Sequence, residues 1–422
     1  MPGLILAAPA SGSGKTTVTL GLLRAFRRRG VAVRGAKSGP DYIDPRFHEA
    51  ACAAPCLNLD AWAMVPARIR ALAATQDLLL IEGAMGLFDG APPDGKGATA
   101  DLARILRLPV VLIVDAAHMA QSVAPLVRGF QAQDPEVRIA GVILNRVGSP
   151  RHADMLRGAL APLGVPVLGA LPRESGLAHP ARHLGLVQAQ ERPDLDAFLD
   201  RAAEAVETAL DLDALAGLAA PLPRAATAPG LPPPAQTIAL AQDAAFAFAY
   251  PHLLADWRAA GATIQVFSPL NDEPVPPADL VILPGGYPEL HAARLAANQG
   301  FTKSLRDAAQ FTEIYGECGG YMVLGESLTD ADGQRHRMAG LLPLDTSFAD
   351  RRLHLGYRRL TPRAGPFAGP LTGHEFHYAT TLRAAGDPLF DATDAAGAAL
   401  PPMGLRVGWV SGSFAHIIDR AD

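Results

Sequence analysis

Short apolar runs recur along the first half of the chain, separated by longer stretches in which apolar residues return with helical spacing. The runs are GLILAAP, VAVRGAK, DLLLIEGA, PVVLIVDA, IAGVILNRV and PVLGALP, all between residues 3 and 172. They are typical of strands that are buried on both faces, and the stretches between them, such as TTVTLGLLRAFRRRG, predict helices. A parallel sheet with crossover helices produces this alternation, so we predict an α/β fold for this half.

The pattern changes at residues 219–236, AAPLPRAATAPGLPPPAQ, where proline is abundant. Such a composition favours a stiff, extended linker. A second series of strand-like runs follows it: TIALAQD, TIQVFSPL, ADLVILPGG and FTEIYG. We therefore predict a first domain over 1–218, a linker over 219–236 and a second α/β domain over 237–422.

Length and composition narrow the class of protein. A chain of 422 residues is long enough for two domains. The formal net charge of −5 argues against nucleic acid as the main partner. Because three cysteines are too few for a disulfide framework, we expect a reduced, cytoplasmic compartment.

The sequence shows no sign of membrane insertion or export. No apolar run approaches the roughly 20 residues that a membrane helix needs, so no membrane partner is expected. The first residues, MPGLILAAPASGSGK, have an apolar core without a basic start and continue directly into a glycine-rich loop. We therefore predict a buried first strand here and not a signal peptide.

That glycine-rich loop connects the first predicted strand to the first predicted helix. Backbone N–H groups at a helix N-terminus can cradle phosphates, the Lys15 ammonium would reach the β- and γ-phosphates of ATP, and the Thr16 hydroxyl would hold Mg²⁺. The usual first glycine, five residues before Gly14, is Pro9 here. The dense SGSGKTT core still favours a nucleotide site over a flexible glycine turn. The residues expected to bind nucleotide in this loop are Ser11, Gly12, Ser13, Gly14, Lys15, Thr16 and Thr17.

Acidic side chains follow two other predicted strands. Glu82 directly follows the apolar residues of DLLLIEGA, and Asp89 comes on the next turn. The segment KSGPDYIDPRFH supplies Asp41 and Asp44, with Lys37 before them. The carboxyl ends of parallel strands meet at one edge of a sheet, so we predict that these four carboxylates surround the metal and the reacting group, with Lys37 at the nucleotide. Taken singly, each carboxylate is better explained as a helix cap or a surface group, and only their expected convergence favours a functional site. The predicted metal ligands are Thr16, Asp41 and Glu82.

A later strand ends in ILNRV, which contains Asn145 and Arg146. We predict that these two side chains contact the adenine, although an ordinary strand end fits the same pattern.

Residues 311–325, FTEIYGECGGYMVLG, place Cys318 between glycines, after a strand-like segment and before the helix-like segment YMVLGESL. Glycines let the chain pass close by without Cβ clashes. A sharp strand-to-helix turn pushes its side chain out of the fold, so we expect an exposed nucleophile at Cys318. An ordinary helix start that contains a small cysteine is the alternative.

A nucleophilic thiol needs a base, and an oxyanion needs hydrogen-bond donors. His416 lies in WVSGSFAHIID, after a strand-like run near the C-terminus, and is the candidate base. Upstream, LVILPGGYPEL ends a strand in two glycines, and we predict that the backbone N–H groups of Gly286 and Gly319 stabilise the oxyanion. Other downstream histidines are His354, His374 and His377.

The motifs PGGYPE, GECGG and SGSFAH together resemble a class I glutamine amidotransferase domain. Joined to the first half, they make the chain similar to the cobyrinic acid a,c-diamide synthase family, and most closely to its hydrogenobyrinic acid branch. The resemblance covers nearly the whole chain and rests on the long strings KSGPDYIDP, IEGAMGLFDG, ECGGYM and GHEFHYA. It implies a P-loop NTPase-type synthetase domain with a parallel sheet, joined to a class I glutamine amidotransferase-like α/β domain.

The resemblance also implies roles for individual residues. Cys318 would be the thioester nucleophile and His416 its activating base. The wider amidotransferase pattern often has a Glu two residues after the His, and this chain has Ile418 there, so only the dyad is carried over. For His374 and His377 in GHEFHYA, cross-strand packing and a role near the domain junction both remain open.

By the same resemblance, the reaction is an ATP-dependent, glutamine-hydrolysing amidation of the a and c side-chain carboxylates of (hydrogeno)cobyrinic acid, through an acyl phosphate, in cobalamin biosynthesis. ATP and Mg²⁺ are the expected cofactors, and glutamine and a corrinoid acid are the expected substrates. The residues by themselves indicate an ATP site joined to an activated thiol.

Three other classes of protein share part of this pattern. A chromosome-partitioning type of ATPase has a similar loop, but it commonly carries an extra lysine where this chain has Ala10, and it lacks a cysteine elbow. Cobyric acid synthase shares both halves but differs in the region of IEGAMGLFDG. A non-catalytic scaffold would lack the Cys–His dyad. The sequence is compatible with a cobalt-free or a cobalt-containing acceptor and with either order of the two amidations, and a homodimer is the working expectation for the oligomeric state.

Overall fold

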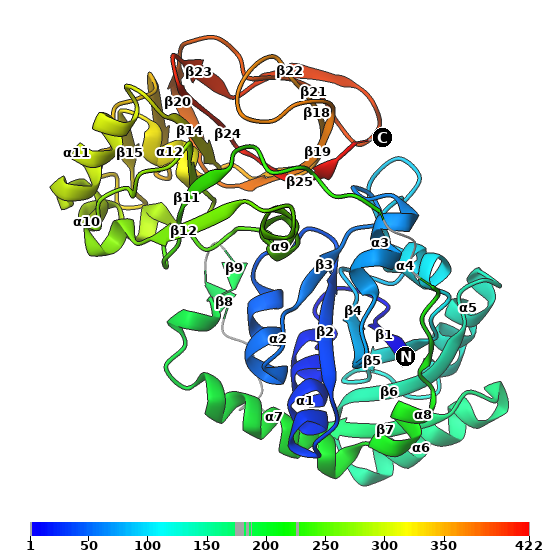
Figure 1. Ribbon diagram of the computed structural model, residues 1–422. Helices are drawn as coiled ribbons and strands as arrows, with labels where there is room; N and C mark the ends of the chain where they lie inside the picture. The colour runs from blue at the N-terminus through cyan, green and yellow to red at the C-terminus, as the bar shows by residue number, and fades with distance from the viewer. Residues whose placement is uncertain (1, 174–180, 183–184, 187, 225–227, 422) are drawn as a thin grey trace. The chain divides into compact units, whose positions relative to one another are not determined.

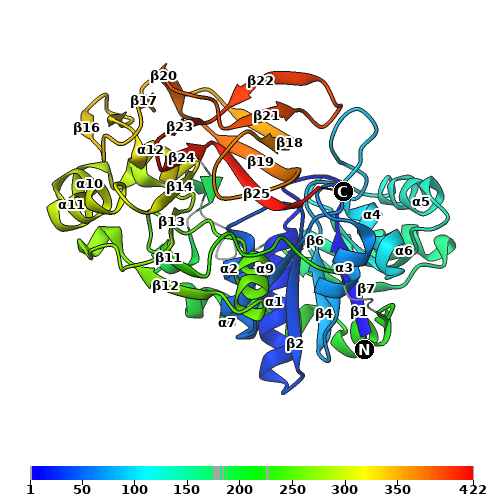
Figure 2. The same cartoon turned by 45° about the horizontal axis from the view of Figure 1, so that its top comes forward.

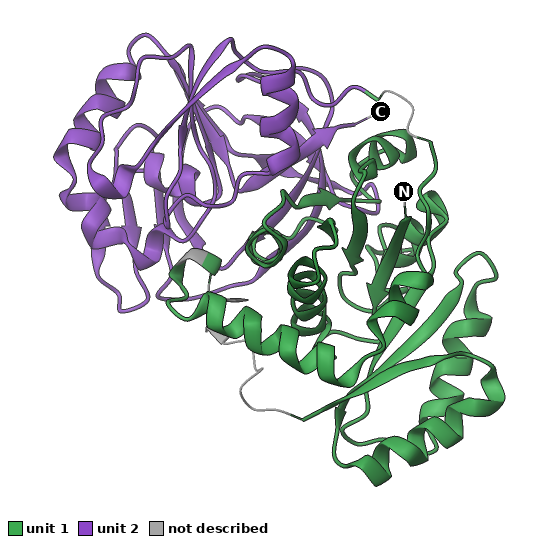
Figure 3. Ribbon diagram, turned by 60° about the horizontal axis from the view of Figure 1, so that its bottom comes forward, with its two compact units in different colours: residues 1–228 green, residues 229–422 purple. Residues whose placement is uncertain are grey.

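The computed structural model describes residues 2–173, 181–182, 185–186, 188–224 and 228–421 (Figure 1). The chain divides into two compact units, residues 1–228 and 229–422 (Figure 3). The division falls inside the proline-rich stretch 219–236. Among the described helices, none combines the length and apolar character that crossing a bilayer requires.

The first unit is built on one sheet of parallel strands, to which a short antiparallel strand is added. The strands are β1 (Pro2–Ala7), β2 (Val33–Ser38), β3 (Leu57–Leu59), β4 (Leu78–Glu82), β5 (Val110–Asp115), β6 (Ile139–Val147), β7 (Val167–Pro172) and β10 (Ala220–Pro221). The parallel strands lie in the order β3-β2-β4-β1-β5-β6-β7, and β10 pairs antiparallel with β1 (Figure 1). Each apolar run predicted as a strand in this half forms one, which confirms the predicted α/β fold.

Helices connect these strands and cover the sheet. They are α1 (Lys15–Arg28), α2 (Asp44–Cys52), α3 (Pro66–Ala73), α4 (Thr99–Leu106), α5 (Val123–Gln133), α6 (Pro150–Leu160), α7 (Leu195–Ala209) and α8 (Leu212–Gly217). Shorter elements are η1 (Ala161–Leu163), η3 (Ala189–Glu191) and the pair β8 (Ala181–Arg182) and β9 (Gly185–Leu186).

One face of the sheet forms the apolar core with α1, α2, α7 and α8. Leu6 of β1 and Ile113 of β5 are fully buried in the same cluster as Phe47 of α2. Helices α1 and α7 cross so closely that a Cβ added at Gly21 would lie 2.5 Å from the Ala202 carbonyl oxygen. The glycine in TLGLL is therefore needed for this crossing.

The loops after β1, β2 and β4 leave the sheet at the same edge. Glu82, the last residue of β4, is level with Leu6 of β1 on one side and with Lys37 of β2 on the other. On its far side β1 pairs with β5, so the strand order reverses around β1. Ligands of open α/β sheets bind at such switch points, beyond the carboxyl ends of the strands.

The second unit contains a mostly parallel sheet. Its strands are β11 (Thr237–Ala241), β12 (Thr263–Phe267), β13 (Leu280–Leu283), β14 (Glu313–Glu317), β23 (Leu405–Val407) and β24 (Val410–Ser413). They lie in the order β12-β11-β13-β14-β24-β23, and only β23 runs antiparallel to its neighbour. The four runs predicted as strands form β11 to β14. The helices are α9 (Pro251–Ala259), α10 (Ala292–Ala297), α11 (Gln299–Ala308), α12 (Gly319–Leu324), η4 (Pro269–Asn271) and η5 (Pro288–Leu290).

The second unit also contains antiparallel sheets that the apolar pattern did not predict. One has the order β16-β15-β17-β20 and the other β22-β21-β18-β19-β25. The helix predicted over YMVLGESL ends at Leu324, because the chain continues after Gly325 into a strand. The strands are β15 (Ser327–Thr329), β16 (Arg335–Arg337), β17 (Leu344–Ser347), β18 (His354–Pro362), β19 (Leu371–His377), β20 (Thr380–Ala384), β21 (Phe390–Thr393), β22 (Ala399–Met403) and β25 (Ala415–Arg420).

The chain passes from one sheet to another within a single residue. Strand β24 of the parallel sheet ends at Ser413, and β25 of the antiparallel sheet begins at Ala415, so Phe414 alone separates them. Strand β25 then runs beside β19 (Figure 2). In the register of this pair, His416 lies directly opposite His374.

Candidate active site

The predicted phosphate loop connects β1 to α1 in a turn that requires glycine. Gly12 and Gly14 have φ angles of 77° and 87°, a left-handed conformation that favours glycine. A Cβ at Gly14 would lie 2.3 Å from the Asn145 side-chain nitrogen, so the position also has no room for a side chain. Helix α1 begins directly after Gly14, which leaves the first N–H groups of the helix directed at the loop.

Lys15, the first residue of α1, is buried and held at the mouth of the loop. Its Nζ donates to the Met85 carbonyl oxygen at 2.5 Å and to the Ala10 carbonyl oxygen at 3.4 Å. Burial lowers the pKa of Lys15, although the nearby carboxylates of Glu82 and Asp44 act against this effect. The ammonium therefore donates to backbone carbonyl oxygens. Phosphate oxygens are better acceptors for a cation and would replace these carbonyls.

The structure brings Thr16, Lys37, Asp44 and Glu82 into one buried cluster. The Thr16 hydroxyl donates to Glu82 Oε1 at 2.7 Å and lies 3.5 Å from Asp44 Oδ2. The Lys37 ammonium donates to Asp44 Oδ2 at 2.6 Å and to Glu82 Oε1 at 2.8 Å. The convergence of these groups, expected from parallel strands that end together, is present in the first unit.

Opposite charges compensate one another in this cluster. Burial alone would lower the pKa of Lys37, but the carboxylates of Asp44 and Glu82 outweigh it and raise that pKa. Burial alone would raise the pKa of Glu82, but the Lys37 charge and a hydrogen bond from His48 move it below its usual range. For Asp44, burial dominates and raises the pKa well above its usual value. Glu82 is therefore the carboxylate that stays ionised in the closed cluster.

His48 and Cys56 extend the cluster, and the sequence interpretation missed both. His48 Nε2 donates to Glu82 Oε2 at 2.6 Å, and His48 Nδ1 lies 3.4 Å from Cys56 Sγ. His48 is fully buried on α2, one turn after Asp44. Its position in KSGPDYIDPRFH was visible, but its contact with Glu82 appears only when α2 packs on the neighbouring strand β2.

Two predicted carboxylates take part mainly in local turns. Asp41 Oδ1 accepts from the backbone N–H groups of Ile43 and Asp44 at the start of α2, and its Oδ2 lies 4.0 Å from Lys37 Nζ. Asp89 Oδ2 accepts from the Gly86 backbone N–H at 2.9 Å. Their catalytic roles, and that of Asp41 as a metal ligand, stay predictions.

A pocket adjoins the loop on the side of β6 and β7. It is lined in part by Gly14, Thr17, Asn145, Arg146 and Pro172. The Asn145 amide donates to the Ser13 carbonyl oxygen at 2.8 Å, and the Arg146 guanidinium donates to Asp115. Both predicted adenine contacts therefore face a pocket beside the phosphate loop, and Asn145 also stabilises the loop itself.

The donor set of the cluster fits a hard divalent cation. Thr16, Asp44 and Glu82 present hydroxyl and carboxylate oxygens, the ligands that Mg²⁺ prefers. Within the described residues, the buried Asp44 Oδ1 has no hydrogen-bond partner. An orphaned carboxylate oxygen beside a phosphate loop is available for coordination without breaking an existing contact.

In the second unit, Cys318 occupies the predicted turn between β14 and α12. Its φ of 46° and ψ of −102° are unusual for a residue with a side chain, and its N–H donates to the Ser413 carbonyl oxygen at 2.8 Å. Gly320 makes the turn possible, since a Cβ there would lie 1.9 Å from the Leu283 carbonyl oxygen. Strain of this kind at a strand-to-helix turn is typical of a nucleophile elbow.

The expected exposure of Cys318 is wrong. The residue is 4% exposed, and its Sγ lies 4.0 Å from the Phe376 carbonyl oxygen of β19. The elbow turns the side chain away from its own strand, as expected, but β19 of the unpredicted antiparallel sheet lies over it. Burial raises the pKa of the Cys318 thiol, and the charges of Glu289, Glu375 and Glu317 raise it further.

The loop after β13 lies against both the elbow and His416. A Cβ at Gly319 would lie 3.0 Å from the Gly286 backbone nitrogen, so the two predicted oxyanion donors are neighbours. A Cβ at Gly285 would lie 2.1 Å from Cε1 of the His416 ring. The thiol, both predicted oxyanion donors and the predicted base are thus gathered around residues 284–286.

His416 is fully buried on β25, and burial lowers its pKa to about 3. With the thiol pKa raised and the imidazole pKa lowered, the resting pair is an uncharged thiol and an uncharged imidazole. A thiolate at Cys318 would therefore require proton transfer to a base, for which His416 is the predicted group.

Two buried glutamates near the elbow were missed at the sequence level. Burial raises the pKa of Glu289 and that of Glu317 to about 8 each. Glu317 Oε2 lies 3.7 Å from His416 Nδ1, and its Oε1 accepts from the Ile417 backbone N–H at 3.1 Å. Glu289 Oε2 makes no hydrogen bond within the described residues. Both stand inside motifs singled out above, GECGG and PGGYPE, but only the fold shows that they are buried.

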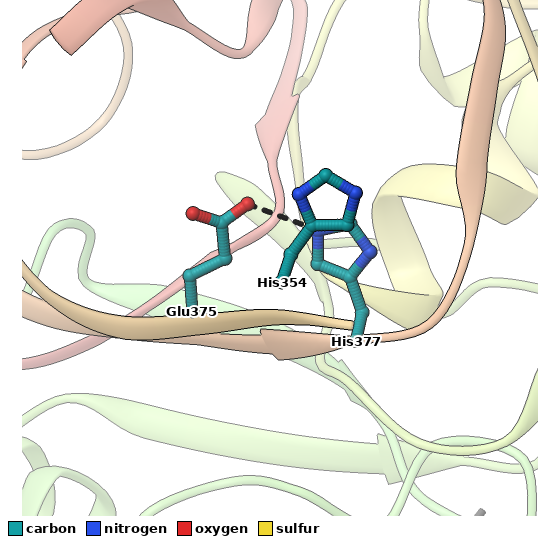
Figure 4. Close-up of side chains that lie close together, drawn as sticks. All are labelled: His354, Glu375 and His377. Carbon is teal, nitrogen blue, oxygen red and sulfur yellow. Dashed lines mark hydrogen bonds and ion pairs between the residues drawn. The ribbon is translucent and has the colours of Figure 1, made fainter. Parts of the chain in front are cut away.

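His354, Glu375 and His377 form a further cluster on β18 and β19, shown in Figure 4. Their side-chain atoms are close enough to share a metal ion. However, Glu375 Oε2 already accepts from the Arg358 guanidinium at 2.7 Å, and Glu375 Oε1 lies 2.9 Å from His377 Nε2. The two imidazole rings stack with centroids 4.6 Å apart and an angle of 7° between their planes. This arrangement is packing across strands, one of the two roles left open for His377.

Comparisons with known proteins agree with both halves of the chain. A family model described as the CobQ/CobB/MinD/ParA nucleotide binding domain matches residues 4–187, and one described as the CobB/CobQ-like glutamine amidotransferase domain matches residues 237–422. The chain is 58% identical to the hydrogenobyrinate a,c-diamide synthase of Brucella anthropi, with 99% of each chain covered. It is 57% identical to the synthase of Brucella suis biovar 1, with 99% of each covered, and 55% identical to that of Rhizobium meliloti, with 100% of each covered.

The chain belongs to the hydrogenobyrinate a,c-diamide synthase family. Membership confirms the resemblance found in the sequence and the predicted pairing of a nucleotide-binding domain with a glutamine amidotransferase domain. The family match extends over essentially the full length of the relatives, so both candidate sites lie within the matched region.

Proposed function

We propose that this chain is an ATP-dependent, glutamine-hydrolysing ligase that amidates the a and c side-chain carboxylates of hydrogenobyrinic acid. The observation that carries the proposal is the combination of two sites in one chain of this family. One is a phosphate loop with a buried acidic cluster, and the other is a strained cysteine turn that shares the loop after β13 with a buried histidine. The relatives are named for this reaction, and the two sites supply its two chemistries.

The first unit would activate the acceptor. A carboxylate does not react with ammonia at neutral pH, whereas an acyl phosphate does. Transfer of the γ-phosphoryl group of ATP to the acceptor carboxylate needs positioning and charge neutralisation more than covalent help from the protein. Lys15 and the backbone N–H groups of the loop would hold the phosphates, and Lys37 would keep Glu82 and Asp44 in place beside Thr16.

Thr16, Asp44 and Glu82 would hold Mg²⁺, and Asp41 is a further candidate ligand near them. When bound, this cation would offset negative charge on the phosphate oxygens. Asn145 and Arg146 would line the nucleoside pocket beside Gly14.

The second unit would release ammonia from glutamine. His416 takes the proton from Cys318 Sγ as the sulfur forms a bond with the amide carbon, and the N–H groups of Gly286 and Gly319 stabilise the oxyanion. The C–N bond then breaks, the proton passes to the departing ammonia, and water cleaves the thioester to give glutamate. Ammonia must reach the acyl phosphate before it is protonated or lost to solvent.

The decisive experiment is to incubate the protein with hydrogenobyrinic acid or cobyrinic acid, together with ATP, Mg²⁺ and glutamine. Mass spectrometry counts the amides formed on each corrinoid. We expect two amides on the cobalt-free acid, with ADP, inorganic phosphate and glutamate as co-products. Amidation of cobyrinic acid alone would assign the other acceptor, and no amide on either corrinoid would contradict the proposal.

A further inference from the structure

We propose that Glu317, the residue immediately before the nucleophile, is the positioning acid for His416. It would take the place of the glutamate that many amidotransferases carry two residues after the histidine. The inference rests on the proposed glutamine hydrolysis at Cys318. It adds a residue that the Cys–His dyad does not include.

The position of the usual acid cannot serve in this chain. Residue 418 is an isoleucine, and its side chain is fully buried. An imidazole that acts as a general base still needs a group that fixes its tautomer and stabilises its cation. A buried acid beside the ring, supplied from another element, would meet the same need.

Glu317, at the end of β14, lies close enough to the His416 ring to do this. Its Oε2 lies 3.7 Å from His416 Nδ1, within ion-pair range although longer than a hydrogen bond. Its Oε1 accepts from the N–H of Ile417 at 3.1 Å. The carboxyl group therefore binds the backbone next to His416 while facing the ring nitrogen. Catalytic hydrogen bonds are often long in a substrate-free site and shorten when the substrate binds.

One turn fixes the acid and the nucleophile together. Glu317 is paired with Ser413 in the β14–β24 register, and the next residue, Cys318, donates its N–H to the Ser413 carbonyl oxygen. Ser413 is three residues before His416 on the same chain. The positions of the acid, the thiol and the imidazole are thus coupled through a few backbone hydrogen bonds.

The other charged groups that face this site either form ion pairs with residues other than His416 or act on it only through their charge. On β19, Glu375 is ion-paired with Arg358 and lies 2.9 Å from His377 Nε2. The charges of His374, His377 and Glu375 affect the pKa of His416 from that strand. Glu289, on η5, affects the pKa of the thiol.

In the proposed hydrolysis, the position of each proton on Glu317, His416 and Cys318 is defined. When Glu317 is ionised, His416 carries its proton on Nδ1, directed at the carboxylate, and Nε2 is unprotonated. Nε2 accepts the Cys318 proton as the S–C bond forms, the carboxylate stabilises the imidazolium, and the proton leaves with ammonia when the C–N bond breaks. Glu317 itself exchanges no proton in the cycle. Because burial raises the pKa of Glu317 to about 8, glutamine hydrolysis should increase as pH rises through that value.

The test compares Glu317→Gln with the matched control Glu313→Gln, which removes a partly buried carboxyl from the same strand and the same face of it. We expect Glu317→Gln to lower kcat for glutamine hydrolysis by roughly 100-fold or more, by analogy with loss of the acid in a Ser-His-Asp triad. KM for glutamine should change less than about threefold, ammonium-dependent amidation should persist, and the rise near pH 8 should disappear. Glu313→Gln should behave as the unmodified protein.

Two results would overturn the assignment. One is a Glu317→Gln variant that keeps the normal kcat and pH profile. The other is equal loss of glutamine-dependent and ammonium-dependent amidation with a lower melting temperature, which would indicate a structural role only.

A measurement on the unmodified protein covers the case in which the variant does not fold. The ¹⁵N spectrum of His416, assigned by its loss in His416→Gln, should show the Nδ1–H tautomer at pH 9. The Nε2–H tautomer would contradict the proposal. This spectrum does not depend on turnover, so it separates failure of the positioning role from failure of the proposed reaction, which would show as absent amidation by the unmodified protein.

Discussion

Both candidate sites bury ionisable side chains, but they treat the charges in opposite ways. In the first unit, Lys37 lies between Asp44 and Glu82 at hydrogen-bond distance, so a buried cation compensates buried anions. In the second unit, burial keeps Cys318 and His416 uncharged. A site that binds phosphates needs permanent charges. A cysteine nucleophile is less reactive as a neutral thiol, which protects it until the substrate is bound. The comparison indicates that the two sites can be disabled separately.

The largest expected effect comes from Lys15→Ala. Loss of the ammonium at the phosphate loop should reduce corrinoid amidation by roughly 1,000-fold or more with either glutamine or ammonium salts, because neither nitrogen source reacts without activation of the carboxylate. Amide formation is followed by mass spectrometry and ATP consumption by a coupled assay. ATP consumption at the normal rate in this variant would contradict the phosphate-loop assignment.

Cys318→Ala should give the reverse pattern. Without the nucleophile, glutamine-dependent amidation should fall to background, while amidation with free ammonium salts should stay within about threefold of normal. Parallel assays with the two nitrogen sources measure the ratio. Normal use of glutamine by this variant would mean that the elbow is not the hydrolytic centre.

Glu82→Gln tests whether the buried cluster of the first unit can be disabled without affecting the second unit. Glutamine at this position removes the negative charge and replaces one of the two oxygens that accept from Lys37 and His48 by an N–H donor, so we expect amidation to fall roughly 100-fold and the free energy of unfolding to fall by about 3–5 kcal/mol. Glutaminase activity, measured as glutamate release in conditions where the variant is folded, should change far less. Equal loss of both activities would indicate general misfolding.

The smallest expected effect is the contribution of the buried, uncharged His416 to how the free energy of unfolding depends on pH. The pKa of His416 is about 3 in the folded chain and about 6.5 when unfolded, so between these values the unfolded state binds more protons and stability falls as pH decreases. Between pH 7 and pH 5 the contribution of His416 to the free energy of unfolding should fall by about 2 kcal/mol. Denaturant unfolding of the native protein and of His416→Gln, at both pH values, measures the difference. An identical pH dependence in the two would refute the neutral, buried imidazole.

At the first site the sequence predicted which strand ends bring their side chains together, but not every member of the cluster, and at the second site it predicted less. Parallel strands end at a shared edge, so residues after β1, β2 and β4 had to converge, and Thr16, Lys37 and Glu82 do so. His48 was missed because its contact with Glu82 depends on how α2 packs.

At the second site, the GECGG motif indicated the strained turn at Cys318, but not the burial of the thiol. That burial depends on β19, which lies in an antiparallel sheet whose strands carry few apolar residues in regular alternation. Glu317 was missed for a related reason. Its neighbour in the sequence drew attention as a nucleophile, whereas its contact with His416 spans about a hundred residues of chain and exists only in the folded unit.

The single residue between β24 and β25 has a consequence for how this protein can vary. Side chains alternate across a strand with a period of two, so one amino acid inserted or deleted next to Phe414 would turn the imidazole to the opposite side of its sheet. Nitrogen release would then stop even though every chemical group were still encoded. This link should therefore tolerate substitutions but not changes in length.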